Sequence, residues 1–258
     1  MSKSFYIDFH THLLPGLDDG SKNAAHSARM LQNAADQRTE TVICTPHFLP
    51  LRETAEEFLN KRENALRSLK SELSFGKLSE AAPKILCGAE CSYIKSISRY
   101  PGLEKLCIEG TSWLLLELPY DDWDDGIFEE IYLLAVERGV FCIVAHVERF
   151  HSQIKKCGGI EAFNELDCVF QLNADSFSFL SDRKKCLSFI SGTVPCVLGS
   201  DMHSCDIGSP AGSAERWLNE QQVKKIYRVS REILLNAPPE CVKETWLDTE
   251  LGLVSAKQ

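Results

Sequence analysis

The sequence of 258 residues lacks an apolar run long enough to cross a membrane, an excess of basic residues, and a low-complexity linker. Its first residues, MSKSFYID, enter a predicted strand almost at once, so we expect no signal peptide, no membrane insertion and a cytoplasmic location. The net charge of −9 argues against a nucleic-acid partner, because a phosphate backbone binds to basic surfaces. Without a linker, residues 1–258 are predicted to form a single domain.

The sequence also lacks the cysteine spacing of a disulfide framework or of a thiolate zinc site, although it contains 11 cysteines. That number is odd, and Cys44, Cys142 and Cys196 lie inside apolar segments. Cys87 and Cys91 have no second cysteine pair with which to form a zinc knuckle. We therefore predict free, buried thiols.

Seven short apolar runs are present, and each ends in side chains that can bind a metal ion. Continuous apolar runs are typical of parallel strands that are buried on both faces. In a closed β/α barrel the carboxyl ends of such strands open onto one face, so a single pocket would collect the end of every run. The sixth run ends only in the weaker ligands Gln171, Asn173 and Asp175. The runs are Phe5–His12, Thr41–His47, Lys84–Glu90, Trp113–Leu118, Phe141–His146, Cys168–Asp175 and Val194–His203.

Segments with helical periodicity separate these runs, which favours an α/β fold with a parallel sheet. Ser21 is the predicted N-cap of the first helix, which extends to Gln37, and Pro238–Pro239 is predicted to stop the last helix. Together the elements predict a TIM-barrel-like (β/α)7 barrel of seven strands. The other predicted helices are Thr54–Leu73, Asp125–Arg138, Ile160–Glu165, Arg183–Ile190, Gly212–Asn219 and Gln222–Leu235.

Histidine and carboxylate side chains dominate the ends of the runs. In His10-Thr11-His12 the two imidazoles point to the same side of a strand, because side chains two residues apart share a face. A carboxylate at the end of a buried strand, such as Glu90 or Glu117, is costly unless a cation or hydrogen bonds compensate it. The predicted metal ligands are His10, His12, Asp19, His47, Glu90, Glu117, His146, Asp201 and His203.

Nine ligands exceed the needs of one ion, so we predict a cluster of two or three divalent ions. Imidazole and carboxylate ligands without thiolate suit manganese, iron or zinc. Such clusters stabilise both the attacking and the leaving oxygen of a displacement, which favours hydrolysis of a phosphate ester. Arg149, three residues after His146, is predicted to hold the phosphoryl oxygens.

Neighbouring polar and aromatic residues are interpreted as support rather than as ligands. Asp18 fits a turn before the first helix, and Asp8 is expected to orient a histidine through a hydrogen bond. For Tyr120, Trp123 and Phe128 we favour plain packing over stacking on the ring of a substrate.

In combination, six motifs resemble the PHP (polymerase and histidinol phosphatase) family and, within it, the bacterial metal-dependent tyrosine-protein phosphatases of capsular and exopolysaccharide systems. The resemblance spans nearly the whole chain. The motifs that carry it are Ile7–His12, Gly16–Gly20, Val42–His47, Gly88–Glu90, Ala145–Phe150 and Ser200–His203.

This resemblance implies a distorted seven-stranded β/α barrel, a centre of three ions usually loaded with manganese, and phosphotyrosine on a partner tyrosine autokinase as the substrate. It also implies that metal-activated water attacks phosphorus while Arg149 helps to hold the phosphate. No cysteine nucleophile is needed, and no cysteine of this chain has an arginine six positions later. A tyrosinate leaving group, with a parent pKa of about 10, needs less help from an acid than an alkoxide does.

One segment departs from the resemblance, which implies an arginine soon after Asp201-Met202-His203, whereas Ser204–Pro210 contains none. The change fits a weaker phosphatase, another phosphoester, or compensation by Arg52 or Arg99. Three other functions stay open: a small-molecule phosphoesterase such as a histidinol-phosphate phosphatase, an amidohydrolase, and a metal-binding scaffold that holds the kinase without turnover. Against the amidohydrolase, the fourth run offers Glu117 where those enzymes commonly use a bridging lysine.

Overall fold

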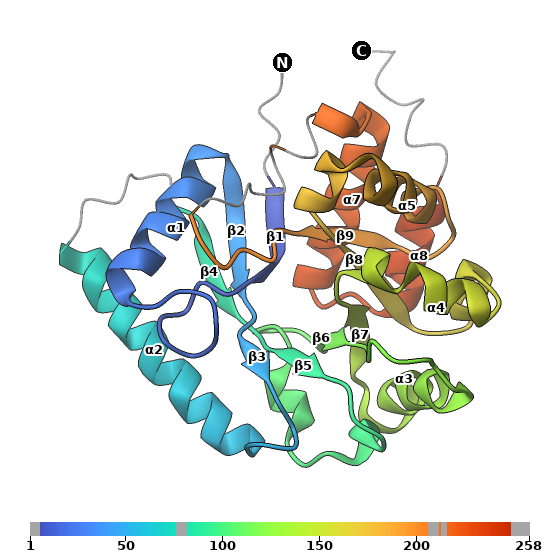
Figure 1. Cartoon of the computed structure of the whole chain (residues 1–258), viewed down its shortest axis with the longest axis horizontal. Helices are drawn as coiled ribbons and strands as arrows, with labels where there is room; N and C mark the ends of the chain where they lie inside the picture. Colours follow the sequence, from blue (N-terminus) through green and yellow to red (C-terminus); the bar gives the residue numbers. More distant parts are fainter. Residues whose placement is uncertain (1–5, 76–81, 206–211, 213–215, 249–258) are drawn as a thin grey trace.

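The computed structural model describes residues 6–75, 82–205, 212 and 216–248, which form parallel β-sheets with helices on the outside (Figure 1). The strands are β1 (Tyr6–Thr11), β2 (Thr39–Cys44), β3 (His47–Phe48), β4 (Lys84–Cys87), β5 (Glu90–Ser92), β6 (Trp113–Glu117), β7 (Phe141–Val144), β8 (Cys168–Asn173) and β9 (Cys196–Gly199). The main α-helices of the described residues are α1 (Ala24–Asp36), α2 (Ala55–Phe75), α3 (Asp125–Arg138), α4 (His151–Lys156), α5 (Leu180–Ile190), α7 (Glu220–Leu234) and α8 (Pro239–Leu247).

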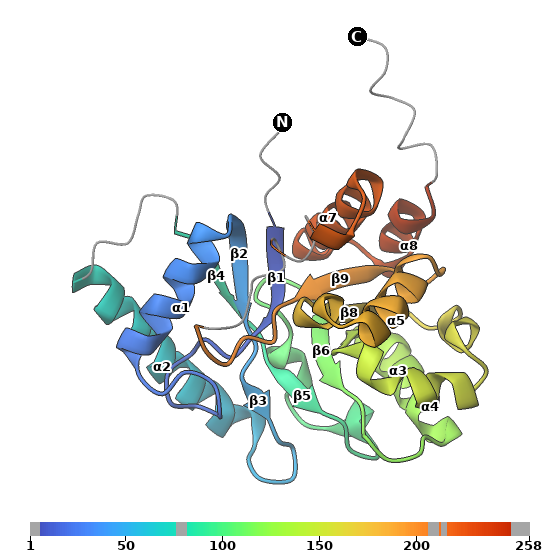
Figure 2. The ribbon, with the colours of Figure 1, turned by 45° about the horizontal axis from the view of Figure 1, so that its top comes forward.

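The strands form one sheet in the order β1-β2-β4 and another in the order β3-β5-β6-β7-β8-β9, and every pairing within them is parallel. The two sheets meet where β1 lies beside the segment after β9 (Figure 2). There the N–H of Asp201 donates to the carbonyl of His10 at 2.8 Å, and the N–H of His12 donates to the carbonyl of Met202 at 3.1 Å. The prediction of an α/β fold with parallel strands is confirmed.

The predicted single sheet of seven strands differs from what is observed, because two of the seven runs are each divided into two strands. The second run breaks between β2 and β3 at Thr45-Pro46, where proline has no N–H to donate to a neighbouring strand. The third run breaks between β4 and β5 at Gly88-Ala89. These two breaks divide the strands into two sheets.

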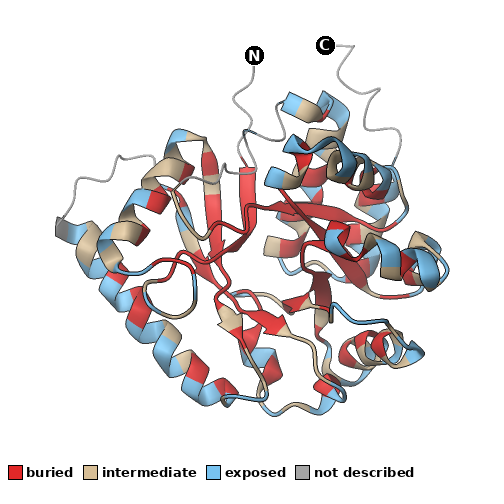
Figure 3. Cartoon of the chain, in the orientation of Figure 1, coloured by how far each residue is buried: buried red, intermediate tan, exposed pale blue. Residues whose placement is uncertain are grey.

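Figure 3 shows that the strands are mostly buried and that the outer faces of the helices are exposed. Most of the buried residues are apolar. Trp113, Phe170 and Phe9 are among the largest fully buried residues. A second apolar cluster, which includes Met30 of α1 and Leu69 of α2, lies between these helices and the sheet of β1, β2 and β4. Among the described helices, none combines the length and the apolarity that crossing a membrane requires.

The first helix begins two residues later than predicted, because Asn23 and not Ser21 is its N-cap. The side chain of Asn23 accepts the N–H of His26 at 2.9 Å. Ser21 is buried, and its hydroxyl lies 2.7 Å from that of Ser27. The prediction failed because serine and asparagine are both good caps and the backbone geometry decides between them.

The predicted last helix, Gln222–Leu235, is observed as α7 and ends before Pro238–Pro239, but it is not the last, since Pro239 is the first residue of α8. Proline is well tolerated at this position because its missing N–H would have no partner inside the helix. The segment Ile160–Phe163 is a 3-10 helix rather than an α-helix, and α4 was not predicted. Of the predicted helix Gly212–Asn219, residues 213–215 lie outside the described residues, while Gly212, Arg216 and Trp217 are helical.

Candidate metal centre

The predicted ligands gather where the strands end, on loops and strand ends that are far apart in the sequence. His10 lies in β1, His47 begins β3, Glu90 begins β5 and Glu117 ends β6. Three groups have ligand atoms within 4.8 Å of one another: His12, Asp19, His47 and His203; His10, His12 and Asp201; and His47, Glu90 and Glu117.

His146, the ninth predicted ligand, belongs beside the third group. Its Nε2 atom lies 3.0 Å from Oε1 of Glu90 and 3.6 Å from Oε1 of Glu117. The His146 ring is buried. All nine predicted ligands are therefore brought to one region of the molecule.

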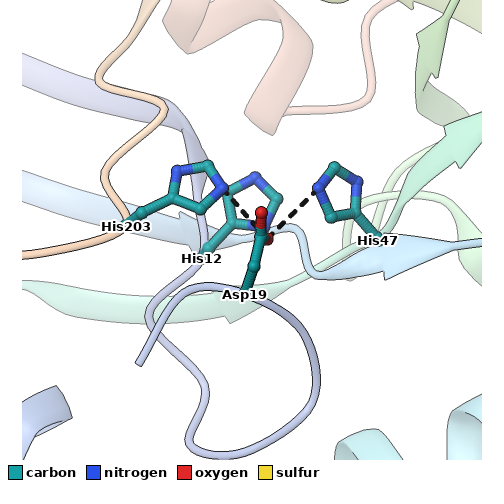
Figure 4. A group of neighbouring side chains, drawn as sticks. All are labelled: His12, Asp19, His47 and His203. Carbon is teal, nitrogen blue, oxygen red and sulfur yellow. Dashed lines mark ion pairs between the residues drawn. The ribbon is translucent and has the colours of Figure 1, made fainter. Parts of the chain in front are cut away.

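The first group, drawn in Figure 4, includes the most exposed of the predicted ligands, Asp19. The Asp19 carboxylate lies between two imidazoles, with its Oδ1 atom 3.2 Å from Nε2 of His203 and 3.5 Å from Nε2 of His47. The His12 and His203 rings stack with their centroids 4.0 Å apart. Because 73% of the Asp19 side chain is exposed, an ion on this side would be accessible from solvent.

The second group is buried, and its hydrogen bonds reveal which ring nitrogens carry protons. Gln171 Oε1 accepts the backbone N–H of His146 at 2.7 Å and lies 3.0 Å from Nδ1 of His10, so this nitrogen of His10 is the protonated one. Nδ1 of His12 lies 2.8 Å from a carboxylate oxygen of Asp18, so it is also protonated. In neutral imidazoles the Nε2 atoms of both rings therefore present lone pairs.

These two Nε2 lone pairs face each other at 3.1 Å. Oδ1 of Asp201 lies 3.5 Å from the Nε2 atom of His10 and 3.4 Å from that of His12, which adds a negative charge to the same point. Two imidazole nitrogens bound to one zinc ion at about 2.0–2.1 Å would lie roughly 3 Å apart. The geometry therefore fits ligands that share a cation.

The carboxylate of Glu90 also lies close to several ligand nitrogens in a way that fits a shared cation. Its buried Oε2 atom lies 2.9 Å from Nδ1 of His47, 3.2 Å from Nε2 of His10 and 3.3 Å from Nε2 of His12. Within the described part of the chain, this oxygen has no partner with hydrogen-bond geometry. A carboxylate oxygen that is surrounded by nitrogens but bonded to none is what a shared metal ion explains.

The charges of the buried residues depend on one another. Burial alone would raise the pKa of Glu90, but the positive charge of His10 holds that pKa well below its ordinary value. Burial alone would lower the pKa of His12, but its contacts with Asp18, Asp201 and Glu90 raise it well above the ordinary value. The carboxylates thus attract positive charge into the centre, and divalent cations would satisfy the same demand.

Residues that sequence reasoning treated as minor hold the ligands in place. Asp18 does not merely form a turn, because its Oδ2 atom fixes the His12 ring at 2.8 Å and accepts the backbone N–H of His47 at 3.1 Å. Asp8 accepts the backbone N–H of Ser200 at 2.8 Å and that of His10 at 3.3 Å. Asp8 therefore positions the backbone of β1 rather than a histidine ring.

The sixth run contributes a chain of amide side chains behind the ligands. Gln171 contacts His10 and donates through Nε2 to Oδ1 of Asn173 at 2.9 Å. Asn173 in turn donates through Nδ2 to Oδ2 of Asp201 at 2.9 Å. The signal in the sequence was their spacing, since alternate residues of one strand point to the same side.

Two of the predicted ligands have unusual backbone conformations. His146 has a φ angle of 32° and Asp201 one of 52°, a region that residues other than glycine seldom occupy. Such conformations concentrate at functional sites, where surrounding contacts maintain them. Gly199, two residues before Asp201, allows close approach, because a Cβ atom there would lie 2.6 Å from the Cβ of His10 and from Nε2 of Gln171.

Arg149 lies at the edge of the centre, as predicted. Its Nη2 atom donates to Oδ2 of Asp201 at 2.6 Å, and its Nη1 atom donates to the hydroxyl of Tyr120 at 3.4 Å. Burial would lower the pKa of Arg149, but the charge of Asp201 raises it, so this side chain stays positive. With 42% of the side chain exposed, the guanidinium is accessible to an anionic ligand.

The segment Ser204–Pro210, where the expected second arginine is missing, lies partly outside the described residues, since 206–210 are not described. Arg52 lies exposed between β3 and α2, and Arg99 lies exposed at the end of the 3-10 helix Ile97–Arg99. Their role as compensating cations stays a prediction.

The fold and the site define a class: an α/β protein whose strand ends bring together imidazole and carboxylate side chains that could hold metal ions, next to an arginine held by a carboxylate. The family model for capsular polysaccharide synthesis, CpsB/CapC, matches residues 6–240. The chain belongs to this CpsB/CapC family, as the motifs of the sequence led us to expect.

Individual relatives agree with this assignment. The tyrosine-protein phosphatase CpsB of Streptococcus agalactiae serotype III is 23% identical over 217 residues, which cover 79% of this chain and 85% of that protein. The tyrosine-protein phosphatase YwqE of Bacillus subtilis is 28% identical over 149 residues, which cover 55% of this chain and 54% of that protein. A solved structure from a study of YwqE of Bacillus subtilis and CpsB of Streptococcus pneumoniae, described as metal-dependent tyrosine phosphatases, aligns with a TM-score of 0.72. That alignment has 19% identity, covers 90% of this chain and 95% of the other, and establishes the shared fold.

Proposed function

We propose that this protein is a metal-dependent protein-tyrosine phosphatase. The observation that carries the proposal is the pair of buried Nε2 lone pairs of His10 and His12, facing each other at 3.1 Å beside Arg149 and two carboxylates. This centre offers both a place for divalent cations and a guanidinium for a phosphoryl group. The names of the relatives in the CpsB/CapC family point to the same activity.

In this proposal the nine predicted ligands hold three ions, which we take to be manganese, with iron and zinc as alternatives. The three groups of ligand atoms support the number of ions, and the absence of thiolate from these groups supports the choice of metal. When bound, the ions would lower the pKa of a water molecule and neutralise charge on the phosphoryl oxygens.

The residues around the ions have separate tasks. Gln171 and Asp18 keep protons on the Nδ1 atoms of His10 and His12, so that the Nε2 atoms stay free to bind metal. Asp201 orients Arg149 through its 2.6 Å hydrogen bond. Arg149 uses its remaining N–H groups to bind the phosphoryl oxygens and to stabilise the charge that grows on them.

We further propose that residues 1–258 form one PHP-type domain and that its nine strand segments act as the seven strands of a distorted β/α barrel. Support comes from the two divided runs, β2 with β3 and β4 with β5. The first strand of each run lies in one sheet and the second strand in the other, so each pair can count as one interrupted barrel strand. We place the protein in the cytoplasm, where its substrate would be phosphotyrosine on a bacterial tyrosine autokinase that controls capsule or exopolysaccharide synthesis. The family assignment to capsular polysaccharide synthesis supports this substrate.

The test is hydrolysis of a phosphotyrosine peptide by the protein with added manganese, after chelation, and in the variants His10→Ala and Arg149→Ala. We expect activity to require the metal and each variant to lose at least about a hundredfold, the scale for losing a positioned electrostatic group. His26→Ala is the matched control, because His26 lies on α1 and belongs to none of the ligand groups found among the described residues.

Full activity after verified removal of metal would overturn the proposal. Much faster hydrolysis of histidinol phosphate than of the peptide would identify a small-molecule phosphoesterase instead. A metal-loaded protein that is inert toward every aryl phosphate would favour a scaffold that binds a kinase without turnover.

A further inference from the structure

The aromatic residues that follow β6 have different surroundings, although the sequence suggested one packing role for all of them. The Trp123 ring lies 5.5 Å from Phe150 and 6.4 Å from Phe128 and is half-buried, as packing requires. Tyr120 is 57% exposed. Tyr120 therefore keeps a large part of its surface open to solvent, unlike Trp123.

The Tyr120 ring also lies next to the metal centre. Its centroid is 6.5 Å from that of His146, with the two ring planes only 23° apart, and it is 5.1 Å from the centroid of Phe150. Its hydroxyl accepts a hydrogen bond from Arg149 at 3.4 Å. The ring thus extends outward from the guanidinium that would hold a phosphoryl group.

Hydrogen bonds hold the loop around Tyr120 in this position. The carbonyl of Tyr120 accepts from Nε2 of Gln153 at 3.0 Å, and the carbonyl of Pro119 accepts from Nε1 of Trp123 at 2.8 Å. Lys156 of α4 contacts Asp122 at 2.6 Å. A ring fixed in advance loses little freedom when a ligand packs on it, which makes it an effective contact surface.

We propose that the exposed surface of the Tyr120 ring binds the aromatic ring of an aryl phosphate whose phosphoryl group lies at Arg149, and so selects aryl over alkyl phosphoesters. This inference rests on the proposed function for its biological substrate. Offset or edge-to-face contacts between aromatic rings are favourable beyond the area they bury, whereas an alkyl chain gains only from burial. Tyr120 is thus a specificity residue that contacts the group leaving from phosphorus.

The test compares the binding of phenylphosphonate and methylphosphonate, which are not hydrolysed, to the metal-loaded protein by titration calorimetry. We expect phenylphosphonate to bind about three- to tenfold more tightly than methylphosphonate, and Tyr120→Ala to remove this preference. Tyr120→Phe keeps the ring without its hydroxyl and should retain the preference. Tyr132→Ala is the matched control, because Tyr132 is an exposed tyrosine of α3, at 51% exposure against 57% for Tyr120.

A preference that survives in Tyr120→Ala would overturn the inference. So would a loss in Tyr120→Phe as large as that in Tyr120→Ala, because the hydroxyl and its contact with Arg149 would then be the cause. Equal binding of the two phosphonates by the unchanged protein, together with hydrolysis of phosphotyrosine, would sink the inference and leave the proposed function standing. A preference for phenylphosphonate without hydrolysis of any aryl phosphate would overturn the proposed function and leave the role of Tyr120 in binding standing.

Discussion

The protein buries ionisable side chains in two regions, and the two regions treat charge in opposite ways. In and around the sheets, eight of the cysteines are buried as free thiols. Burial raises the pKa of Cys107 and of Cys168 to about 12, so these thiols are neutral and need no partner. At the strand ends, Glu90 is just as buried, but its negative charge requires a positive partner, and its Oε2 atom lies 3.2 Å from Nε2 of His10.

This difference separates a packed side chain from a ligand. A buried thiol fills space like a small apolar residue, and removing its neighbours leaves no charge behind. A buried carboxylate that loses its positive partners is left with an uncompensated charge, which is strongly destabilising. If the strand ends bind metal ions as proposed, they depend on a cation in a way that the thiols do not, and four measurements test that contrast.

The largest effect is expected from Glu90→Gln, which removes one negative charge from the middle of the ligands and keeps the shape of the side chain. Oε2 of Glu90 lies within 3.3 Å of three imidazole nitrogens, so its loss affects more than one group of ligands. We expect phosphatase activity to fall at least about a hundredfold. The rise in melting temperature on adding manganese should also become smaller, since a ligand stabilises the protein only as far as it binds the native state.

Glu137→Gln on α3 is the matched control, because Glu137 is an exposed residue outside the ligand groups found in the described part of the chain. If Glu90→Gln bound manganese with unchanged affinity and stoichiometry, Glu90 would be a packed residue like the thiols, and the contrast would fail.

A smaller effect is expected from Gln171→Leu, which removes the oxygen that contacts Nδ1 of His10 at 3.0 Å and the N–H of His146 at 2.7 Å. Changes to the partners of metal-binding histidines typically weaken metal binding by about 10–100-fold. Titration of the metal-free protein with manganese gives the affinity directly. Gln32→Leu on α1 serves as the control, and an unchanged affinity in Gln171→Leu would reduce Gln171 to a packing residue.

The convergence of the predicted ligands could be anticipated from the sequence, but the residues that hold them in place could not. His10, His146 and Glu90 follow or end apolar runs, and parallel strands bring such ends together whatever the details of the loops. The contact of Asp18 with His12 depends on how the loop after β1 curls back, and no periodicity encodes that conformation. The sequence therefore placed Asp18 and Asp19 in the correct region, but it did not reveal that Asp18 contacts the His12 ring.

For the fold, too, the general arrangement was predictable from the sequence but the local details were not. Strand direction follows from the alternation of runs and helices, whereas the division into two sheets depends on two short interruptions, at Thr45-Pro46 and Gly88-Ala89. The apolar pattern continues through both interruptions, so it does not reveal that pairing stops there. Pro239 shows the same limit, because a proline that ends one helix and a proline that starts another look alike in the sequence.

A loss of stability is expected from Gly199→Ala, since the new Cβ would meet the Cβ of His10 and Nε2 of Gln171 at 2.6 Å. Overpacking of this kind typically costs about 1–3 kcal/mol, measured by urea unfolding. Activity should fall as well, because His10 must move. Gly110→Ala is the comparison: its φ of +81° makes alanine strained, yet no described atom lies within 4 Å, so stability alone should change.

The smallest effect concerns the thiols, whose alkylation should be blocked in the folded protein. With iodoacetamide at pH 8, mass spectrometry should detect labels only on Cys157, Cys205 and Cys241, which are exposed or partly exposed. The others are buried, and burial raises the pKa of Cys87 to about 11, so little reactive thiolate forms. Unfolding in urea should release all 11 cysteines for labelling. Removing the metal should leave the labelling pattern unchanged, because the buried thiols have no charge for the ions to balance. Labelling of Cys142 or Cys168 after chelation would contradict this and would mean that bound ions also stabilise the sheet.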